Sequence, residues 1–285
     1  MKGIVWLASY PKSGNTWFRV FLTNLLWEGP ADINKLYTNA ITSSRETFDY
    51  YAGIDSQELD SDEIDLIRPT VFRLIAQEAK AQLYMKVHDA YTFVAEDRPL
   101  IPPPATSCAL YFLRNPLDVA VSFAHHGNLT FDRAVNALGT KDYKISDNPR
   151  QLSRHLRQHL LSWSEHVLSW VDRPPFPVCV LRYEDMILKP QETFEKAVRF
   201  INLPHSAEQI AKAVEASAFD RLQAQETATG FQERAAIKSA FFRKGKIGSW
   251  REELNEEQVQ KIVSDHRDVM KRFGYLDEHD QIVFG

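Results

Sequence analysis

Residues 3–8 read GIVWLA, residues 9–16 read SYPKSGNT, and residues 17–27 form an amphipathic stretch that begins and ends with tryptophan. This order predicts a strand, a turn and a helix, with Lys12 in the turn. A turn that leads into a helix presents unpaired backbone N–H groups and the positive end of the helix dipole, which together bind a phosphate. Lys12 adds a mobile cation, so the stretch predicts an anion site. The alternative is an ordinary surface turn that caps a helix.

The turn departs from the P-loop pattern G-x-x-x-x-G-K-[ST], in which lysine directly precedes the hydroxyl residue that holds magnesium. Here Asn15 precedes Thr16, and the lysine stands earlier in the turn. The pattern therefore argues against a P-loop kinase or NTPase, which is one alternative for this chain.

The chain has 285 residues, of which 44% are hydrophobic and 12% aromatic, enough for one large α/β domain or two smaller ones. Its formal net charge of -4 argues against a general nucleic-acid binder, which would carry a basic stripe. Anion binding is therefore expected to be local, and a small anionic ligand fits better than a polyanion.

Cys108 and Cys179 are the only cysteines. They make neither a disulfide framework nor a four-ligand zinc site, so a reducing cytoplasm is the expected compartment. The apolar run before Pro11 is too short for a signal peptide, and no run approaches the ~20 apolar residues of a membrane span. His155 and His159 lie four apart in an expected helix, but no catalytic glutamate follows His155, and no metal is expected.

Hydrophobic periodicity predicts strands alternating with helices. The expected strands cover residues 3–8, 83–88, 107–113 and 176–181, and the expected helices cover residues 17–27, 70–81, 152–170, 191–202, 206–217 and 255–273. Residues 30–69 are expected to be irregular and solvated, with the acidic side chains between positions 55 and 65 unbalanced by any base. The alternation predicts a single α/β domain over residues 1–285, with a central, mainly parallel sheet and helices on both faces.

The expected strand at residues 83–88 ends in a histidine. Lys86 and His88 share one face of this strand, because side chains alternate along a strand. Two cations therefore point the same way. A histidine at a strand end is either a structural hydrogen-bonding residue or a catalyst, and these residues alone leave both interpretations open.

Residues 114–118 read RNPLD and predict a helix start, with Asn115 as N-cap and Pro116 as the first helical residue. Ser122 follows one turn further in. Arg114 and Ser122 are expected to bracket one phosphate, the arginine through a forked charged contact and the serine through its hydroxyl. The alternative is a well-capped helix whose Arg114 pairs with a carboxylate.

Three strings resemble, in order, the cofactor motifs of sulfotransferases that use 3′-phosphoadenosine 5′-phosphosulfate (PAPS). Residues 10–17 match seven of the eight positions of Y-P-K-S-G-T-T-W, and the one exception, an asparagine, resembles bacterial members of the family. Residues 111–122 match every fixed position of the 3′-phosphate motif Y-x-x-R-N-x-x-D-x-x-x-S. Residues 243–250 match R-K-G-x-x-G-x-W, although Ser249 and Arg251 depart from the common D-W-K ending.

The resemblance covers the whole chain and implies an α/β fold like that of P-loop nucleoside triphosphate hydrolases, with PAPS as the sulfuryl donor. The family carries K-T-H or K-S-H at residues 86–88, which implies that His88 is the general base and that Lys12 and Lys86 hold the sulfuryl group. The implied cofactor-binding residues are Lys12, Ser13, Gly14, Asn15, Thr16, Trp17, Arg114, Ser122, Tyr183, Ser217, Phe219, Arg243, Lys244 and Gly245. Trp17 and Phe219 would sandwich the adenine ring.

The composition turns polar from residue 224 to residue 240, so a lid-like segment is expected at about residues 224–250. The expected acceptor is a small molecule, a sugar or a peptide-like molecule. The sequence lacks the K-x-x-x-T-V-x-x-x-E dimerisation segment of the animal enzymes, and a monomer or weak dimer is expected. The alternative from another class is a catalytically inactive nucleotide-binding interaction module, from which His88 distinguishes the enzyme.

Overall fold

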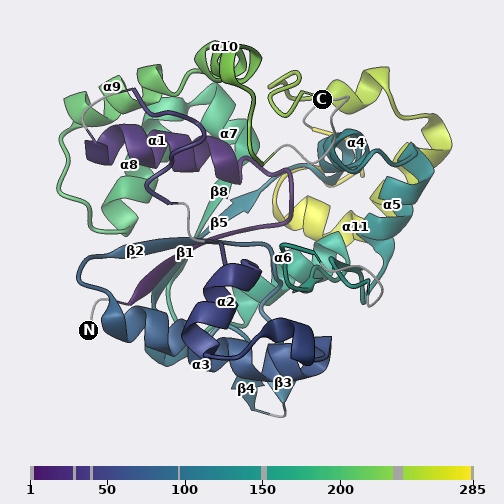
Figure 1. Cartoon of the computed structure of the whole chain (residues 1–285). Helices are drawn as coiled ribbons and strands as arrows, with labels where there is room; N and C mark the ends of the chain where they lie inside the picture. The colour runs from purple at the N-terminus through teal and green to yellow at the C-terminus, as the bar shows by residue number, and fades with distance from the viewer. Residues whose placement is uncertain are drawn as a thin grey trace. The chain divides into compact units, whose positions relative to one another are not determined.

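The computed structural model describes residues 3–27, 30–38, 41–95, 97–148, 153–233 and 240–283. The chain forms two compact units, each assembled from separate parts of the sequence (Figure 1). The first unit comprises residues 1–10, 38–111 and 141–180, and the second comprises residues 11–37, 112–140 and 181–285. The expectation that residues 1–285 act as one domain stays a prediction.

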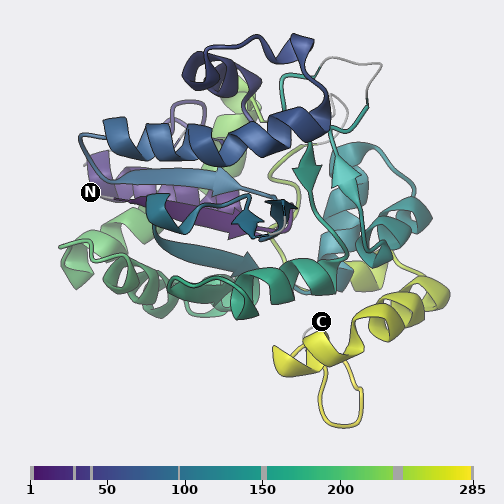
Figure 2. The ribbon, with the colours of Figure 1, turned by 90° about the horizontal axis from the view of Figure 1, so that it is seen from below.

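A four-stranded sheet lies mainly in the first unit, with its strands in the order β2-β1-β5-β8. The strands are β1 (Ile4–Ser9), β2 (Leu83–Val87), β5 (Thr106–Leu113) and β8 (Val178–Arg182). β1 and β2 pair in parallel, and their arrows point the same way in Figure 2. Every residue of β1 is buried, which is typical of a parallel strand covered on both faces.

Two neighbouring residues of β5 each pack against a helix of their own unit. In the first unit, Tyr111 stacks on Trp170 of α6 (Trp163–Asp172), with ring centres 6.4 Å apart. In the second unit, Phe112 packs against Phe18 of α1 (Asn15–Trp27), with ring centres 5.0 Å apart. The predicted α/β class, with a central parallel sheet flanked by helices, is confirmed.

The first unit also contains α2 (Arg45–Ala52), η1 (Ser56–Glu58), α3 (Ser61–Glu78), η2 (Pro103–Ala105) and two small sheets, formed by β3 (Phe93–Ala95) with β4 (Arg98–Pro99) and by β6 (Lys144–Ile145) with β7 (Gln158–His159). The expectation that residues 30–69 are irregular is therefore wrong. α3 begins where a capping box forms: the Asp60 side chain accepts from two backbone N–H groups, and the Glu63 side chain bonds the Asp60 backbone in return. The helix expected at residues 70–81 is the second half of α3.

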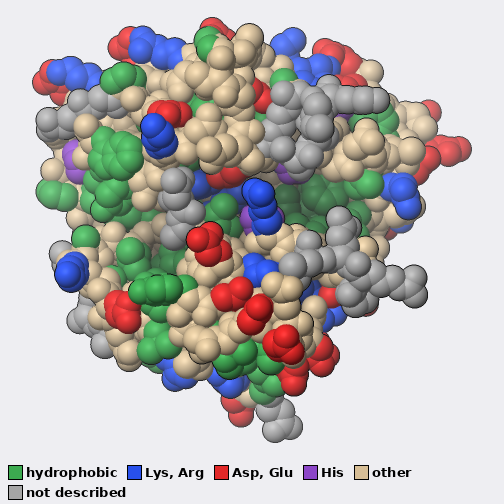
Figure 3. Space-filling view, viewed as in Figure 1, with side chains coloured by type: hydrophobic (Ala, Val, Ile, Leu, Met, Phe, Trp, Pro, Cys, Tyr) green, Lys and Arg blue, Asp and Glu red, His purple; other side chains and the backbone are tan. Residues whose placement is uncertain are grey.

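Acidic side chains gather over α2 and α3 in Figure 3. Two acidic side chains of α3 are balanced by bases, contrary to expectation. Arg157 pairs with Asp62 and Asp65, each at 2.5 Å. The fully buried Arg68 also pairs with Asp65, at 3.2 Å. Arg157 lies 92 residues after Asp65 in the chain. The positive charge that balances these carboxylates therefore comes from a distant segment, which only the tertiary structure brings close.

The expectation of a single long helix at residues 152–170 is also wrong. α6 begins only at Trp163, where a capping box forms, and β7 precedes it. His155 and His159 therefore do not share a helix, and Nε2 of His159 contacts Asp65 at 2.6 Å. Within the described ranges, no group of three or more His, Cys, Asp or Glu side chains could hold a metal ion.

The second unit contains α1, α4 (Pro116–Gly127), α5 (Phe131–Gly139), α7 (Tyr183–Leu188), α8 (Pro190–Phe200), α9 (Ala207–Ala216), α10 (Phe219–Thr229), η3 (Ser249–Glu252) and α11 (Glu256–Arg272). α9 packs against α1 and α8, and α5 packs against α4 and α11 (Figure 1). The helices expected at 191–202, 206–217 and 255–273 are confirmed.

At the start of the lid-like segment expected at about residues 224–250, the structure differs from the expectation. The first residues of this segment, to Thr229, continue α10 as a helix instead of being irregular, and residues 234–239 lie outside the described residues. In the part of the chain that the structure describes, no helix is both long and apolar enough to cross a membrane.

Candidate functional site

The loop between β1 and α1 has the backbone of an anion site. Lys12 and Gly14 have positive φ angles of 73° and 95°, and the helix begins at Asn15, so its unpaired N–H groups follow the loop directly. A Cβ atom on Gly14 would lie 2.7 Å from the Tyr183 ring, so glycine is required there. The buried hydroxyl of Ser13 has no hydrogen-bond partner among the described residues, which suits it to a bound anion.

Arg114 ties this loop to the end of β5. Its Nη1 donates to the Lys12 carbonyl at 3.0 Å, and its Nη2 donates to the Lys246 carbonyl at 3.4 Å. Its guanidinium carbon lies 4.1 Å from the centre of the Tyr183 ring, whose hydroxyl has a pKa raised by burial. Among the described residues Arg114 pairs with no carboxylate, and its buried Nε has no partner, so a charged donor remains for a bound anion.

The start of α4 joins two of the predicted motifs. Asn115 caps the helix through its side chain, as predicted, and its N–H donates to the buried Glu184 carboxylate at 3.0 Å. The carboxylate of Asp118 accepts from the N–H groups of Gly248 at 2.8 Å and Trp250 at 3.2 Å. The aspartate of the 3′-phosphate motif thus anchors the third motif on α4.

The two cationic side chains of the third motif, Arg243 and Lys244, form ion pairs with carboxylates. Nη1 of Arg243 lies 2.7 Å from Oε1 of Glu253, and Nζ of Lys244 lies 2.8 Å from the same oxygen. Lys244 also contacts Glu252 at 2.6 Å, while Nε2 of His125 contacts the second Glu253 oxygen at 2.5 Å. Burial raises the pKa of the Glu253 carboxyl, but hydrogen bonds from His125, Lys244 and Arg243 outweigh burial and lower it to about 2.

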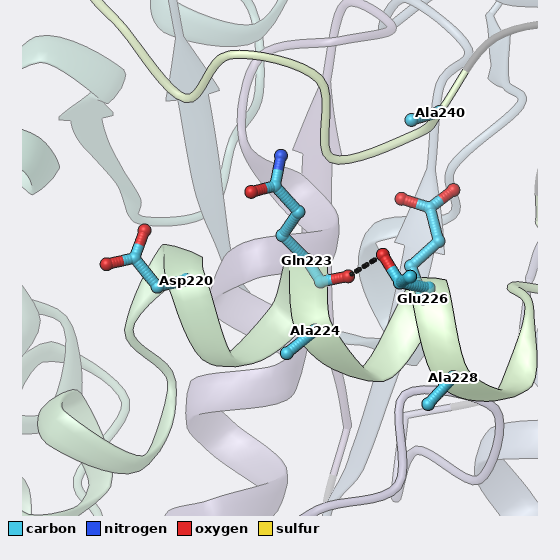
Figure 4. A pocket seen from close by; sticks show the side chains of 7 residues that line it. Asp220, Gln223, Ala224, Glu226, Ala228 and Ala240 are labelled. Atoms are coloured by element: carbon cyan, nitrogen blue, oxygen red, sulfur yellow. Dashed lines mark hydrogen bonds between the residues drawn. The ribbon is translucent and has the colours of Figure 1, made fainter.

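Side chains of α10 hold the backbone that enters the third motif. The two oxygens of Glu226 accept from the N–H groups of Phe241 at 2.7 Å and Phe242 at 2.8 Å. Gln223 donates to the Phe242 carbonyl at 3.0 Å. Figure 4 shows Gln223 and Glu226 projecting from α10 toward the segment that carries Ala240, and these residues line a pocket of about 620 Å³.

Two ring contacts bring the third motif, and the residue two positions before it, to other predicted residues. The Lys12 ammonium lies 3.6 Å from the centre of the Phe241 ring, a cation–π contact. Gly245 has a φ of 60°, and a Cβ atom there would lie 2.5 Å from the Phe219 ring. The motif therefore needs glycine at this position, because a side chain would meet both unfavourable backbone geometry and an aromatic ring.

The predicted adenine-binding residues lie around Trp17. Its Nε1 donates to the Ser217 carbonyl at 2.8 Å, and its ring meets that of Tyr183 edge-on, with centres 6.0 Å apart. The fully buried hydroxyl of Ser217 accepts from Asn24 at 2.9 Å. Ser122 lies half-buried in α4, and Thr16 lies buried in the first turn of α1. Their contacts with a nucleotide stay predictions.

His88 belongs to the first unit and directly follows β2. Its Nδ1 lies 2.8 Å from the Ser9 carbonyl and 3.2 Å from the Ser9 hydroxyl. A carbonyl oxygen only accepts, so Nδ1 carries the proton and Nε2 is the basic nitrogen. Lys86, two residues earlier, is half-buried, and its carbonyl accepts from Thr42 at 3.0 Å.

Buried groups fix the backbone of His88. Its carbonyl accepts from Nε2 of His166 at 3.0 Å, and Nδ1 of His166 accepts from the Tyr111 hydroxyl at 2.8 Å. Burial lowers the pKa of His166 to about 4, so its ring is neutral and serves as donor and acceptor at once. The next residue, Asp89, pairs with the fully buried Arg68 at 2.6 Å.

Within the second unit the structure thus brings together Lys12, Ser13, Gly14, Trp17, Arg114, Tyr183, Phe219, Arg243, Lys244 and Gly245, and within the first unit it places Lys86 and His88 at the end of β2. Sequence reasoning missed the roles of Ser9, Asp118, Glu226 and Glu253. Of these four roles, only that of Glu253 had a visible signal in the sequence. The acidic pair Glu252 and Glu253 directly follows the third motif, whose usual D-W-K ending is absent. The other contacts join residues distant in sequence and left no local pattern.

A family model described as the sulfotransferase domain matches residues 2–274. The chain therefore belongs to the sulfotransferase family, whose members use PAPS, and the resemblance seen in its motifs is confirmed.

Among curated proteins, the chain is 24% identical to flavonol 3-sulfotransferase of Flaveria bidentis, over 90% of this chain and 78% of that protein. It is also 24% identical to amine sulfotransferase of Oryctolagus cuniculus, over 94% of this chain and 81% of that protein. Among solved structures it resembles mouse sulfotransferase SULT7A1 complexed with PAP, with a TM-score of 0.61 and 19% identity over 95% of this chain and 84% of that chain. This last likeness supports the P-loop-like α/β fold.

Proposed function

We propose that this chain transfers the sulfuryl group of PAPS to a hydroxyl or amine of an acceptor, with His88 as the general base. The observation that carries the proposal is the loop after β1, where Ser13 and Arg114 keep buried donors beside the N-terminus of α1. These donors fit a phosphosulfate, because they offer charge and N–H groups without a metal. When bound, PAPS supplies the sulfuryl group.

In this proposal Nε2 of His88 accepts the acceptor proton, because the Ser9 carbonyl holds the proton of Nδ1 on the other side of the ring. The Lys12 and Lys86 ammonium groups neutralise charge on the transferring group. Arg114, Ser122, Arg243 and Gly245 hold the 3′-phosphate, and Trp17, Tyr183 and Phe219 hold the adenine. His166 keeps the His88 backbone in place.

The acceptor is proposed to be a small molecule, a sugar or a peptide-like molecule. Similar proteins are named for flavonols and amines, which supports hydroxyl and amine acceptors as a class. A cytoplasmic location is supported by Cys108 and Cys179, which are buried and form no disulfide among the described residues. A P-loop kinase and an inactive nucleotide-binding module are not favoured, because the sulfotransferase family match covers nearly the whole chain.

Thermal unfolding with two nucleotides tests the donor site. 3′,5′-Adenosine diphosphate (PAP) at about 100 times its Kd should raise Tm by about 5–10 °C, whereas AMP at the same concentration should raise it far less. AMP lacks the 3′-phosphate that Arg114 and Ser122 are proposed to bind. Equal shifts with both nucleotides would remove the 3′-phosphate assignment. A PAPS turnover screen with phenols, sugars, amines and peptides then identifies the acceptor class, and no turnover with any class would favour the inactive module.

A further inference from the structure

We infer that Glu253 is an internal competitor of the donor's 3′-phosphate: its carboxylate occupies Arg243 and Lys244, and the phosphate must displace it. This inference rests on the proposed function, which assigns Arg243 to the 3′-phosphate, and it adds Lys244, the neighbouring cation of the third motif. Glu253 itself has no role in that proposal. It lies two residues after Arg251, the last position at which this chain departs from the common D-W-K ending of its family's motif.

The carboxylate contacts the same cations that the phosphate would use. One Glu253 oxygen lies 2.7 Å from Arg243 and 2.8 Å from Lys244, which are hydrogen-bond distances for charged partners. The other oxygen contacts His125 at 2.5 Å. The Glu253 side chain is only 14% exposed, so water screens these contacts less than it screens an exposed pair of the same unit such as Lys212 and Glu208, whose side chains are 74% and 76% exposed.

Glu253 also lies beside the other half of the proposed phosphate site. His125 and Ser122 are three residues apart on α4 and therefore neighbours on one helix face. The contact with His125 thus brings the Glu253 carboxylate to the face of α4 that carries Ser122.

The backbone that carries Glu253 is fixed, so the carboxylate is held against the cations without help from a ligand. Asp118 anchors the N–H groups of Gly248 and Trp250, and the Glu253 N–H donates to the Trp250 carbonyl at 3.1 Å. Ordering this turn therefore costs little when Glu253 engages the cations.

A 3′-phosphate carries a charge of about -1.5 to -2 near neutral pH, and it would repel a carboxylate that shares its cations. Binding therefore exchanges one anion for the other, and part of the affinity for the donor is lost in releasing Glu253. Nucleotides without a 3′-phosphate do not approach these cations and leave Glu253 in place. The residue thus lowers affinity for the 3′-phosphorylated nucleotide specifically.

The test is calorimetric titration of the wild type, Glu253→Gln and Glu252→Gln with PAP and with AMP. Glu253→Gln keeps the size of the side chain and removes its charge, so it should bind PAP about fivefold to tenfold more tightly, a change that corresponds to one charged contact. AMP affinity should stay within about twofold, because AMP does not reach the cations. Glu252→Gln is the matched control. The Glu252 side chain also contacts Lys244, but it is 61% exposed, and among the described residues no contact joins it to Arg243, so PAP affinity should change little.

Unchanged or weaker PAP binding by Glu253→Gln would overturn the inference, because the carboxylate would then order the cations instead of competing for them. Equal tightening for PAP and AMP would also overturn it, since the effect would not act on the 3′-phosphate. Failure of the proposed function has a different signature, which is a wild type that binds PAP and AMP equally well. A loss of folding cannot imitate the expected result, because it weakens binding.

Discussion

Replacing His88 by alanine separates catalysis from cofactor binding. Loss of a general base should lower kcat by about 10² to 10⁴-fold with a weakly acidic acceptor such as a sugar hydroxyl, and by less with a phenol. The structural cost includes the hydrogen bond from Nδ1 to the Ser9 carbonyl at 2.8 Å, which is worth about 1 kcal/mol. That loss corresponds to a decrease in Tm of about 2–4 °C for a chain of this size.

PAP affinity should stay within about twofold of the wild type in His88→Ala, because the contacts of Arg114, Arg243 and Lys244 are made within the second unit. The assays are steady-state rates with a defined acceptor and calorimetric titration with PAP. His155→Ala is the matched control, since its Nδ1 also bonds a serine hydroxyl, that of Ser43 at 3.2 Å, and it should keep its rate. Near-normal rates for His88→Ala would make this histidine structural. Loss of both rate and PAP affinity would mean that it holds the cofactor site or the fold.

Gly245→Ala should bind PAP at least about tenfold more weakly, because its Cβ would lie 2.5 Å from the Phe219 ring at a φ of 60°; unchanged affinity in a titration would contradict the close approach. Asp118→Asn should lower the free energy of unfolding in urea by about 1–3 kcal/mol, since an amide oxygen replaces a charged acceptor for two N–H groups; no change would mean that these bonds do not stabilise the fold. The pKa of His166 is about 4 in the folded state and near 6.5 in the unfolded state. Between these values the unfolded state binds one more proton, so the free energy of unfolding should fall by about 3 kcal/mol as the pH drops from 6.5 to 4. Unfolding curves of the wild type and His166→Gln measure that loss, which should be absent in the variant; equal slopes would assign the acid sensitivity to other groups. Turnover should survive EDTA, because cations and helix N–H groups take the place of magnesium, and activity abolished by EDTA and restored by Mg²⁺ would return the P-loop kinase to consideration.

Elements whose signals lie in neighbouring residues were predictable from the sequence. The apolar run of β1, the turn at Lys12 and the cap at Asn115 depend on backbone conformations that a few adjacent residues control, and the structure has all three. The prediction missed the start of α3 for a different reason. The capping box of Asp60 and Glu63 was present in the sequence, but the high acidity of the segment was interpreted as solvated irregular chain.

The boundary of α6 shows where periodicity misleads. Apolar residues spaced like a helix extend well ahead of Trp163, yet His159 lies in β7, because pairing with β6 supplies its backbone hydrogen bonds from another segment. Periodicity reports which side chains are buried. It does not report which backbone partner is available.

The sequence by itself determined the family, the order of its motifs and the identity of the residues proposed for the site. The tertiary structure alone decided how those residues are held: which nitrogen of His88 carries the proton, through Ser9, and which anion occupies Arg243. Asp118 likewise acquired its role only when the chain folded, by accepting from N–H groups 130 and 132 residues away. The physical reason is that hydrogen bonds and ion pairs act over a few ångströms, so they depend on contacts between distant segments that no local pattern encodes.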